Sequence, residues 1–241
     1  MSNNKVDILA FAAHPDDIEL SAAGTLMKHI AQGKKVAIVD LTQGELGSRG
    51  TIQTRYEEAA AASEIMGVHF RENVKMEDGF FEINEANKRK IIEQVRRFQP
   101  EIVLANAVTD RHPDHGRAGQ LVSEACFLSG LLKIETEWEG KKQEKHRPNA
   151  VYHYIQDYYL NPDFVVDISE FYDRKMEAIL AYRTQFFDPE STEPETPISG
   201  KDFMEFITSR MRQYGRPVGV QYAEGFTAER FIGVDDLFDL K

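Results

Sequence analysis

Residues 6–19 read Val-Asp-Ile-Leu-Ala-Phe-Ala-Ala-His-Pro-Asp-Asp-Ile-Glu, an apolar run that leads directly into a polar turn. The run Val6–Ala13 predicts a buried strand, because it is almost continuously apolar. The turn that follows carries a histidine and two carboxylates, and its proline stiffens it by fixing φ. Open parallel sheets bind their ligands beyond the carboxyl ends of strands, where this turn lies. We therefore expect His14, Asp16 and Asp17 to belong to a site.

Apolar runs alternate with amphipathic runs along the rest of the chain. Strands that alternate with helices favour a parallel sheet with helices on both faces. Since no repeat or linker divides the sequence, we predict one α/β domain over residues 1–241, with a Rossmann-like, mostly parallel sheet. The predicted later strands are 35–41, 73–77, 101–107, 151–155 and 164–168, and the predicted helices are 18–32, 51–66, 84–98, 170–186 and 201–214.

A polar segment separates the last two predicted helices. Residues 188–197 hold three prolines and four acidic residues. This composition is typical of an extended loop. We expect a solvated connector here rather than a lid over a site.

The composition limits the classes of function. The 241 residues include 40 acidic and 29 basic side chains, for a formal net charge of -11. This charge repels phosphate backbones and anionic lipids, so we expect neither nucleic acid nor a membrane as a partner. The first apolar run is too short for a signal peptide or a membrane span, and we expect a cytoplasmic protein. The one cysteine, Cys126, is expected to be a small buried hydrophobic residue.

A second polar turn follows the predicted strand at 101–107. It reads Thr-Asp-Arg-His-Pro-Asp-His-Gly over residues 109–116 and supplies His112, Asp114 and His115. Either turn alone is as compatible with a helix cap as with a functional site. Two such turns, at the ends of two strands of one parallel sheet, predict a single site with three imidazoles and three carboxylates.

This set of side chains suits metal-assisted hydrolysis. Two histidines and one carboxylate, with one coordination position left open, form a catalytic zinc site in many hydrolases. A spare carboxylate is then available as a base, and a spare histidine as an acid or hydrogen-bond donor. The spacing alone does not distinguish Asp16 from Asp17, or His112 from His115, in these roles.

Other classes of enzyme lack their signatures here. The first turn has no Gly-x-Gly-x-x-Gly for a dinucleotide, and its two aspartates would repel phosphate. The Gly-x-Ser-x-Gly turn of serine hydrolases is also absent from the sequence. A non-haem iron oxygenase uses a similar ligand set, but there we would expect an all-β barrel.

Several motifs together resemble one known family. They are Ala-His-Pro-Asp-Asp-Ile-Glu at 13–19, Thr-Gln-Gly-Glu-Leu-Gly at 42–47, His-Pro-Asp-His at 112–115, and Tyr-Gly-x-x-x-Gly-Val-x-Tyr-Ala-Glu-Gly-Phe at 214–226. They resemble the PIG-L/LmbE-type zinc deacetylases, which remove acetate from N-acetylglucosamine conjugates. The details are most similar to the bacillithiol-pathway branch, the N-acetylglucosaminyl-malate deacetylases.

The resemblance implies a role for each residue of the two turns. One Zn²⁺ per chain would be bound by His14, Asp17 and His115. Asp16 would be the general base. His112 would stabilise the oxyanion or act as an acid, with Asp114 holding its imidazole by a hydrogen bond. The family also implies a homo-oligomer, with a hexamer suspected.

Charged residues beside the turns are candidates for substrate binding. A malyl glycoside carries two carboxylates, which suit bidentate contacts from arginine. The candidates are Arg49, Arg55, Arg111 and Glu45. The alternative is that the arginines pair with nearby acids and brace the loops. We favour substrate contact for Arg55 and leave Arg49 and Arg111 open between the two roles.

The leading functional hypothesis is hydrolysis of the acetamide of a small glucosamine conjugate, N-acetylglucosaminyl malate. A chitooligosaccharide or an inositol conjugate is the alternative substrate within the family. A non-catalytic protein that binds carbohydrate or metal is the alternative outside it. Asp16 and His112 speak against the last one, because binding alone would not need them.

Overall fold

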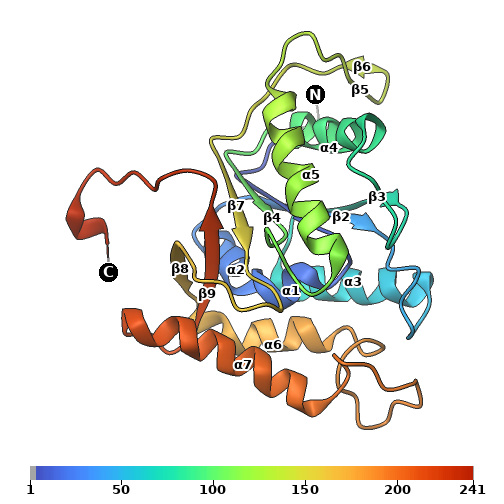
Figure 1. Cartoon of the computed structure of the whole chain (residues 1–241), viewed down its shortest axis with the longest axis vertical. Helices are drawn as coiled ribbons and strands as arrows, with labels where there is room; N and C mark the ends of the chain where they lie inside the picture. The colour runs from blue at the N-terminus through green and yellow to red at the C-terminus, as the bar shows by residue number, and fades with distance from the viewer. Residues whose placement is uncertain (1–3, 241) are drawn as a thin grey trace.

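The computed structural model describes residues 4–240 and is built around one seven-stranded sheet (Figure 1). The strands lie in the order β3-β2-β1-β4-β7-β9-β8. The strands of this sheet are β1 (Ile8–Ala12), β2 (Val36–Thr42), β3 (Phe70–Met76), β4 (Ile102–Ala105), β7 (Ala150–Tyr154), β8 (Phe164–Asp167) and β9 (Ala223–Ala228), and the α-helices are α1 (Asp17–Ser21), α2 (Ala23–Ala31), α3 (Ile52–Met66), α4 (Glu85–Phe98), α5 (Pro113–Ser129), α6 (Tyr172–Leu180) and α7 (Lys201–Gly215).

The pairing of the strands confirms a mostly parallel sheet. β1 pairs in parallel with β2 on one side and with β4 on the other. β7 continues the parallel part beside β4, whereas β9 runs antiparallel between β7 and β8. The chain thus leaves β1 toward β2 and β3, and later returns to the opposite side of β1 with β4. The boundary between β1 and β4 is therefore the topological switch point, where open α/β sheets bind ligands.

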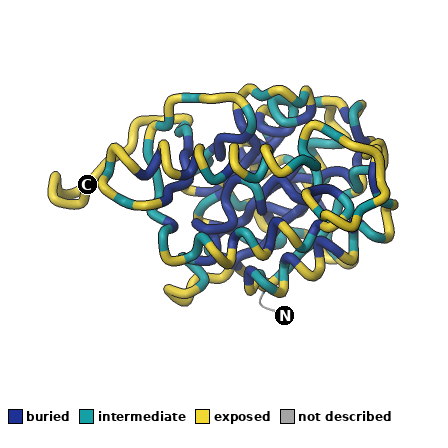
Figure 2. Tube along the Cα trace, turned by 90° about the horizontal axis from the view of Figure 1, so that it is seen from below, coloured by how far each residue is buried: buried dark blue, intermediate teal, exposed yellow. Residues whose placement is uncertain are grey.

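Helices cover both faces of the sheet, as predicted. Leu9 and Phe11 of β1 pack in one apolar cluster with side chains of α4 and α5. Ile8 and Ala10 point to the opposite face and pack with side chains of α1, α2 and α6. Figure 2 shows the buried residues concentrated between these layers. The alternation along β1 follows from the two-residue period of a strand, with both faces buried.

The first predicted helix is interrupted at Ala22, where α1 ends and α2 begins. The backbone N–H groups of Gly24 and Thr25 donate to the carboxylate of Glu224 instead of to the preceding turn. Lys175 Nζ donates both to the freed Leu20 carbonyl and to Glu224. A buried ion pair therefore satisfies the polar groups that the interruption exposes.

Besides the short antiparallel pair β5 (Glu137–Trp138) and β6 (Lys141–Lys142), two longer elements were not expected from the sequence. α5 begins with His112 as its N-cap and a proline in its first turn, both suited to a helix start. Its glycines weaken the helical pattern, but Gly119 is needed because a Cβ there would lie 2.8 Å from the Asn106 carbonyl oxygen. β9 contains the buried Glu224, and this charged residue interrupts the apolar run that would indicate a buried strand. Within residues 4–240, no helix is both long and apolar enough to cross a bilayer.

Candidate metal centre and catalytic pocket

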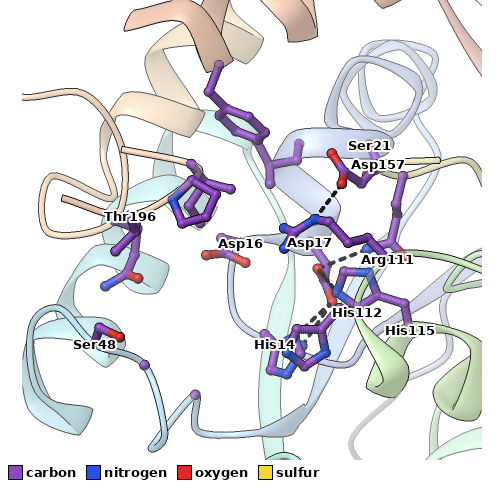
Figure 3. Close-up of a pocket in the computed structure, with 18 of the residues that line it drawn as sticks. His14, Asp16, Asp17, Ser21, Ser48, Arg111, His112, His115, Asp157 and Thr196 are labelled. Atoms are coloured by element: carbon purple, nitrogen blue, oxygen red, sulfur yellow. Dashed lines mark hydrogen bonds and ion pairs between the residues drawn. The ribbon is translucent and has the colours of Figure 1, made fainter. Parts of the chain in front are cut away.

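The two polar turns meet at the switch point, as the sequence predicted. The first turn follows β1 and leads into α1, and the second lies between β4 and α5. Asn106 connects them: its Oδ1 accepts a hydrogen bond from Ala13 N at 2.9 Å, and its Nδ2 donates to Asp17 Oδ2 at 2.9 Å. Figure 3 shows His14, His112 and His115 grouped with Asp17 on one side of a cavity.

The Asp17 carboxylate faces two of these imidazoles. Asp17 Oδ1 lies 3.1 Å from His115 Nε2, and Asp17 Oδ2 lies 3.8 Å from His14 Nδ1. The Asp17 carboxylate is fixed by hydrogen bonds from Gln156 Nε2 at 3.0 Å and from the His14 backbone N–H at 3.0 Å. Two imidazoles and one carboxylate in this arrangement are a suitable ligand set for zinc.

The remaining nitrogen of each imidazole faces a carboxylate. His14 Nε2 lies 3.0 Å from Asp78 Oδ1 and 3.4 Å from Asp114 Oδ2. His115 Nδ1 lies 2.6 Å from Asp110 Oδ2. Such outer carboxylates orient metal-binding histidines and raise their basicity. They leave His14 Nδ1 and His115 Nε2 as the nitrogens free to bind a metal ion.

The electrostatics of the cluster favour a cation. Burial opposes the charged form of His14, but hydrogen bonds to Asp114 and Asp78 outweigh it and raise the pKa of His14 to about 10. Burial likewise opposes protonation of His115, and the Asp17 and Asp110 carboxylates raise the pKa of His115 to about 9. Burial also opposes ionisation of Asp17, but the positive field of His115 outweighs it and lowers the pKa of Asp17 well below its usual value. The carboxylates around the two histidines therefore give the site a negative charge, which favours a bound cation.

The donor atoms of two triads, neither of them the set with Asp17, all lie within 4.8 Å of one another: His14 with His112 and His115, and His14 with Asp78 and Asp114. In the second triad, Arg117 Nη1 already lies 2.7 Å from Asp114 Oδ1 and supplies a positive charge. His112 of the first triad uses its Nδ1 to accept a hydrogen bond from Asp114 N at 3.3 Å. These contacts favour the set formed by His14, Asp17 and His115.

Asp16 has an unusual backbone and environment. Its φ is 125°, a value that non-glycine residues rarely adopt, and its side chain makes no capping hydrogen bond to α1. The alternative of a simple helix cap therefore fails for this residue. Burial raises the pKa of Asp16 to about 7 against the opposing charge of Arg55. A carboxyl group that titrates near neutral pH suits general acid–base chemistry, and backbone strain of this kind concentrates at functional sites.

His112 lies beside His14, with 4.6 Å between the ring centroids. Burial, together with the charges of His14 and His115, lowers the pKa of His112, so its neutral form dominates near pH 7. Since Nδ1 accepts from the Asp114 backbone, we assign the proton to Nε2. The expected bond from the Asp114 carboxylate to His112 is wrong: that carboxylate faces His14 and Arg117, and accepts from Gly79 N.

The cavity above the cluster has a volume of about 300 Å³. Residues of both turns form one side, and Ile207 and Arg210 of α7 contribute to the wall. Thr196 and Pro197 also line it, and Figure 3 shows Thr196 across the cavity from the histidines. The expectation that 188–197 is only a solvated connector is therefore wrong at its C-terminal end.

The four predicted substrate-binding residues take different positions. Arg55 and Arg111 line the cavity, whereas Arg49 and Glu45 do not. The Arg55 guanidinium is buried, and its Nη1 donates to the Pro15 carbonyl at 2.8 Å and to Asp16 Oδ2 at 2.8 Å. Arg55 thus holds the first turn. Arg55 therefore follows the alternative in which the arginine pairs with an acid and braces a loop. Its partner, Asp16, is an acid that the sequence did not suggest.

The other three residues are also engaged with the protein. Arg111 is half-exposed, and its Nε donates to Asp157 Oδ2 at the cavity wall. Arg49 is buried and its Nη2 donates to Ser191 Oγ. Glu45 accepts from the backbone N–H groups of Asp78 and Gln43, at 2.9 Å and 3.1 Å. Glu45 and Arg49 therefore brace loops and do not line the cavity, so their contact with substrate stays a prediction.

Sequence reasoning missed four residues of the site. Asp78 follows β3, Asn106 follows β4 and Gln156 follows β7, so the strand-end rule that found the two turns could also have found these three. Arg210 lies within α7, where the sequence gives no signal that separates it from a surface arginine. Each contacts or faces the cavity or its ligand set.

Comparisons with known proteins agree with this geometry. The model of the family PIG-L, GlcNAc-PI de-N-acetylase, matches residues 9–126, which include both turns. The structure of a conserved protein of Thermus thermophilus is similar, with a TM-score of 0.85 and 36% identity over 95% of this chain and 98% of that one. The diacetylchitobiose deacetylase of Thermococcus kodakarensis is 28% identical over 95% of this chain and 84% of its own length.

Other relatives differ in activity. A probable N-acetyl-alpha-D-glucosaminyl L-malate deacetylase 2 of Bacillus anthracis is 24% identical over 76% of this chain and 83% of its own length. A 4-oxalmesaconate hydratase of Pseudomonas putida is 28% identical over 74% of each chain. The similarity thus extends to a hydratase as well as to deacetylases. By its fold, its two turns and its similarity to these proteins, the chain belongs to the PIG-L family and is a hydrolase of the deacetylase type.

Proposed function

We propose that this chain is a zinc-dependent N-deacetylase that hydrolyses the acetamide of N-acetylglucosaminyl malate. The observation that carries the proposal is the convergence of His14, Asp17 and His115 beside a buried carboxyl group, Asp16, whose pKa is about 7. The named activity of the Bacillus anthracis relative supports the malate conjugate. Arg111 at the cavity wall supports an anionic substrate as well.

In this proposal His14, Asp17 and His115 hold one Zn²⁺ per chain. When bound, the ion acts as a Lewis acid and makes hydroxide available near neutral pH. Asp78, Asp114 and Asp110 keep the two imidazoles in their binding orientation. This ligand set leaves room in the cavity for the acetamide.

Asp16 and His112 perform the proton chemistry. Asp16 removes a proton from the attacking water, while Arg55 keeps its carboxylate in place. His112, protonated at Nε2, donates a hydrogen bond to the developing oxyanion. The carbon–nitrogen bond then breaks, and the proton held by Asp16 passes to the leaving amine. The products are acetate and a free glucosamine nitrogen.

The test is acetate release by protein stripped of metal and then given one equivalent of zinc. We expect hydrolysis of N-acetylglucosaminyl malate to exceed that of methyl N-acetylglucosaminide and of N,N′-diacetylchitobiose. The control is Asp16→Asn, which should bind zinc as the wild type does but lose at least about 100-fold in kcat. Faster hydrolysis of diacetylchitobiose would instead favour a chitooligosaccharide substrate.

The hydratase relative supplies a second candidate, the addition of water to 4-oxalmesaconate. The same base and metal ligands would serve both reactions. Incubation with 4-oxalmesaconate separates the two, because hydration consumes that substrate and releases no acetate. If the protein binds zinc but acts on none of these substrates, it would be a non-catalytic protein that binds carbohydrate or metal.

The assembly and location of the chain remain predictions. The segment after β9 runs away from the sheet (Figure 1) and exposes Phe231, Leu237 and Phe238. Large exposed apolar side chains favour contact with another protein surface. We propose a homo-oligomer, a hexamer by family resemblance, in the cytoplasm. Light scattering of the purified protein measures its mass directly.

A further inference from the structure

Arg210 is a buried cation at the wall of the cavity. It lies in the third turn of α7, is 8% exposed, and lines the cavity together with residues of both polar turns. Its Nη1 is buried and has no hydrogen-bond partner among the described residues. A buried guanidinium nitrogen without a partner is unfavourable, and functional sites are where such groups persist.

The acids nearest to Arg210 are committed to other groups. Asp157 and Asp110 interact with it electrostatically, but Asp157 accepts from Arg111 Nε, and Asp110 is held by His115 Nδ1 and by Tyr158 N. These carboxylates therefore leave the Arg210 charge only partly compensated.

A third acid that interacts with Arg210 is also committed to other groups. Glu224 also contributes to the field, but Lys175 and the start of α2 occupy both of its oxygens. Burial outweighs all of these acids and lowers the pKa of Arg210 from its usual value. The guanidinium lacks a full counter-charge from the protein.

The Phe206 ring packs against the Arg210 guanidinium. The Arg210 Cζ lies 5.4 Å from the centroid of the Phe206 ring, within the range of a cation–π contact. This contact fixes the position of the side chain but satisfies none of its N–H donors. An arginine that is held in place with free donors is prepared to bind a planar anion in bidentate fashion.

We propose that Arg210 binds a carboxylate of the substrate's aglycone inside the cavity and so makes the enzyme selective for acidic glycosides. This inference rests on the proposed deacetylase function, because it names the substrate class of the same site. Arg111 at the cavity wall would take the second carboxylate of a dicarboxylate aglycone. The acetamide would then lie over the metal ligands while the aglycone lies against α7.

The experiment compares Arg210→Met with the wild type on three substrates: N-acetylglucosaminyl malate, methyl N-acetylglucosaminide and N-acetylglucosamine 1-phosphate. We expect kcat/KM for the malyl glycoside to fall about 10- to 100-fold, the range of one charge-assisted hydrogen bond. The neutral methyl glycoside should change by less than about 3-fold. An equal loss on both overturns the proposal, and a loss confined to the phosphate ester overturns the choice of a carboxylate.

Two variants control for damage to the fold. Arg212→Met removes an exposed arginine of the same helix and should leave all three substrates unchanged. Arg210→Lys keeps the charge and should retain more activity on the malyl glycoside than Arg210→Met does. Because Arg210 Nη1 has no protein partner among the described residues, the Tm of Arg210→Met should equal or exceed that of the wild type. A clear fall in Tm would assign Arg210 a structural role and overturn the proposal.

A binding measurement separates this inference from the proposed function. Calorimetric titration with L-malate should show binding to the zinc-loaded wild type and at least about 10-fold weaker binding to Arg210→Met. If the wild type releases no acetate from any glycoside but malate binding depends on Arg210, the proposed function fails and the carboxylate site stands. If malate binds both proteins equally, the carboxylate site fails whatever the activity.

Discussion

Arg55 offers the sharpest test of how the first turn works. Its Nη1 donates to Asp16 Oδ2 and to the Pro15 carbonyl, both at 2.8 Å, so it positions the proposed base and does not reach out to substrate. In Arg55→Met, Asp16 loses a charge-assisted hydrogen bond, worth about 1.5–3 kcal/mol. At about 1.36 kcal/mol per pKa unit, this loss raises the pKa of Asp16 by about 1–2 units. The direction is upward because Arg55 stabilises the charged form.

The expected effect on the rate follows from this shift. On the acid limb of the pH profile, the deprotonated fraction of Asp16 falls about tenfold for each unit by which its pKa rises. A rise of about 1–2 units should therefore lower kcat by up to about 10- to 100-fold at a pH on this limb. Asp16 acts as a base only when deprotonated, so the acid limb of the profile of kcat against pH should move to higher pH. Activity should then recover partly near pH 9.

The assay is acetate release by zinc-loaded protein between pH 5.5 and 9.5, with KM and kcat determined at each pH. Bound zinc should equal that of the wild type, because Arg55 contacts none of the three proposed ligands. Arg111→Met is the matched control: it removes an arginine that lines the cavity and should raise KM without moving the acid limb. A rise in KM alone in Arg55→Met, with kcat and its pH profile unchanged, would refute the positioning role and restore substrate contact.

Three further predictions concern the ligands, the oxyanion and the fold. Asp78→Asn should weaken zinc affinity about 10- to 100-fold in competition with a chelator, because it removes a carboxylate from His14 Nε2; unchanged affinity would exclude that role. His112→Ala should lower kcat about 100- to 1000-fold with zinc still bound, and loss of zinc would show that His112 is a ligand. Lys175→Met should reduce the free energy of unfolding by about 3–5 kcal/mol in urea, since it leaves Glu224 buried without its cation. A change below about 1 kcal/mol would contradict that account of the interrupted helix.

The fold was predictable where local pattern decides it. The apolar run of β1 and the alternation of strands with helices were enough to predict the sheet and its two covered faces. The interruption between α1 and α2 was not, because Glu224 lies 200 residues from Gly24 in the sequence. α5 was missed because its glycines weaken the helical signal, although Gly119 serves close packing against the Asn106 carbonyl.

The site was predictable in position but not in the direction of its side chains. The strand-end rule placed His14, Asp17 and His115 together. Near the turns, the charge of an arginine does not show whether its side chain holds a loop in place or lines the cavity. Arg49 donates to Ser191, whereas Arg111 lines the cavity. Arg210 lies far beyond the second turn in the sequence, and only the packing of α7 brings it to the cavity.

The central claim is that the two turns form one metal site. Anomalous scattering at the zinc edge, from a crystal of the zinc-loaded protein, measures this directly. We predict one peak per chain, within about 2.0–2.2 Å of His14 Nδ1, an Asp17 carboxylate oxygen and His115 Nε2. A peak between Asp78 and Asp114, or no peak at the switch point, would contradict it.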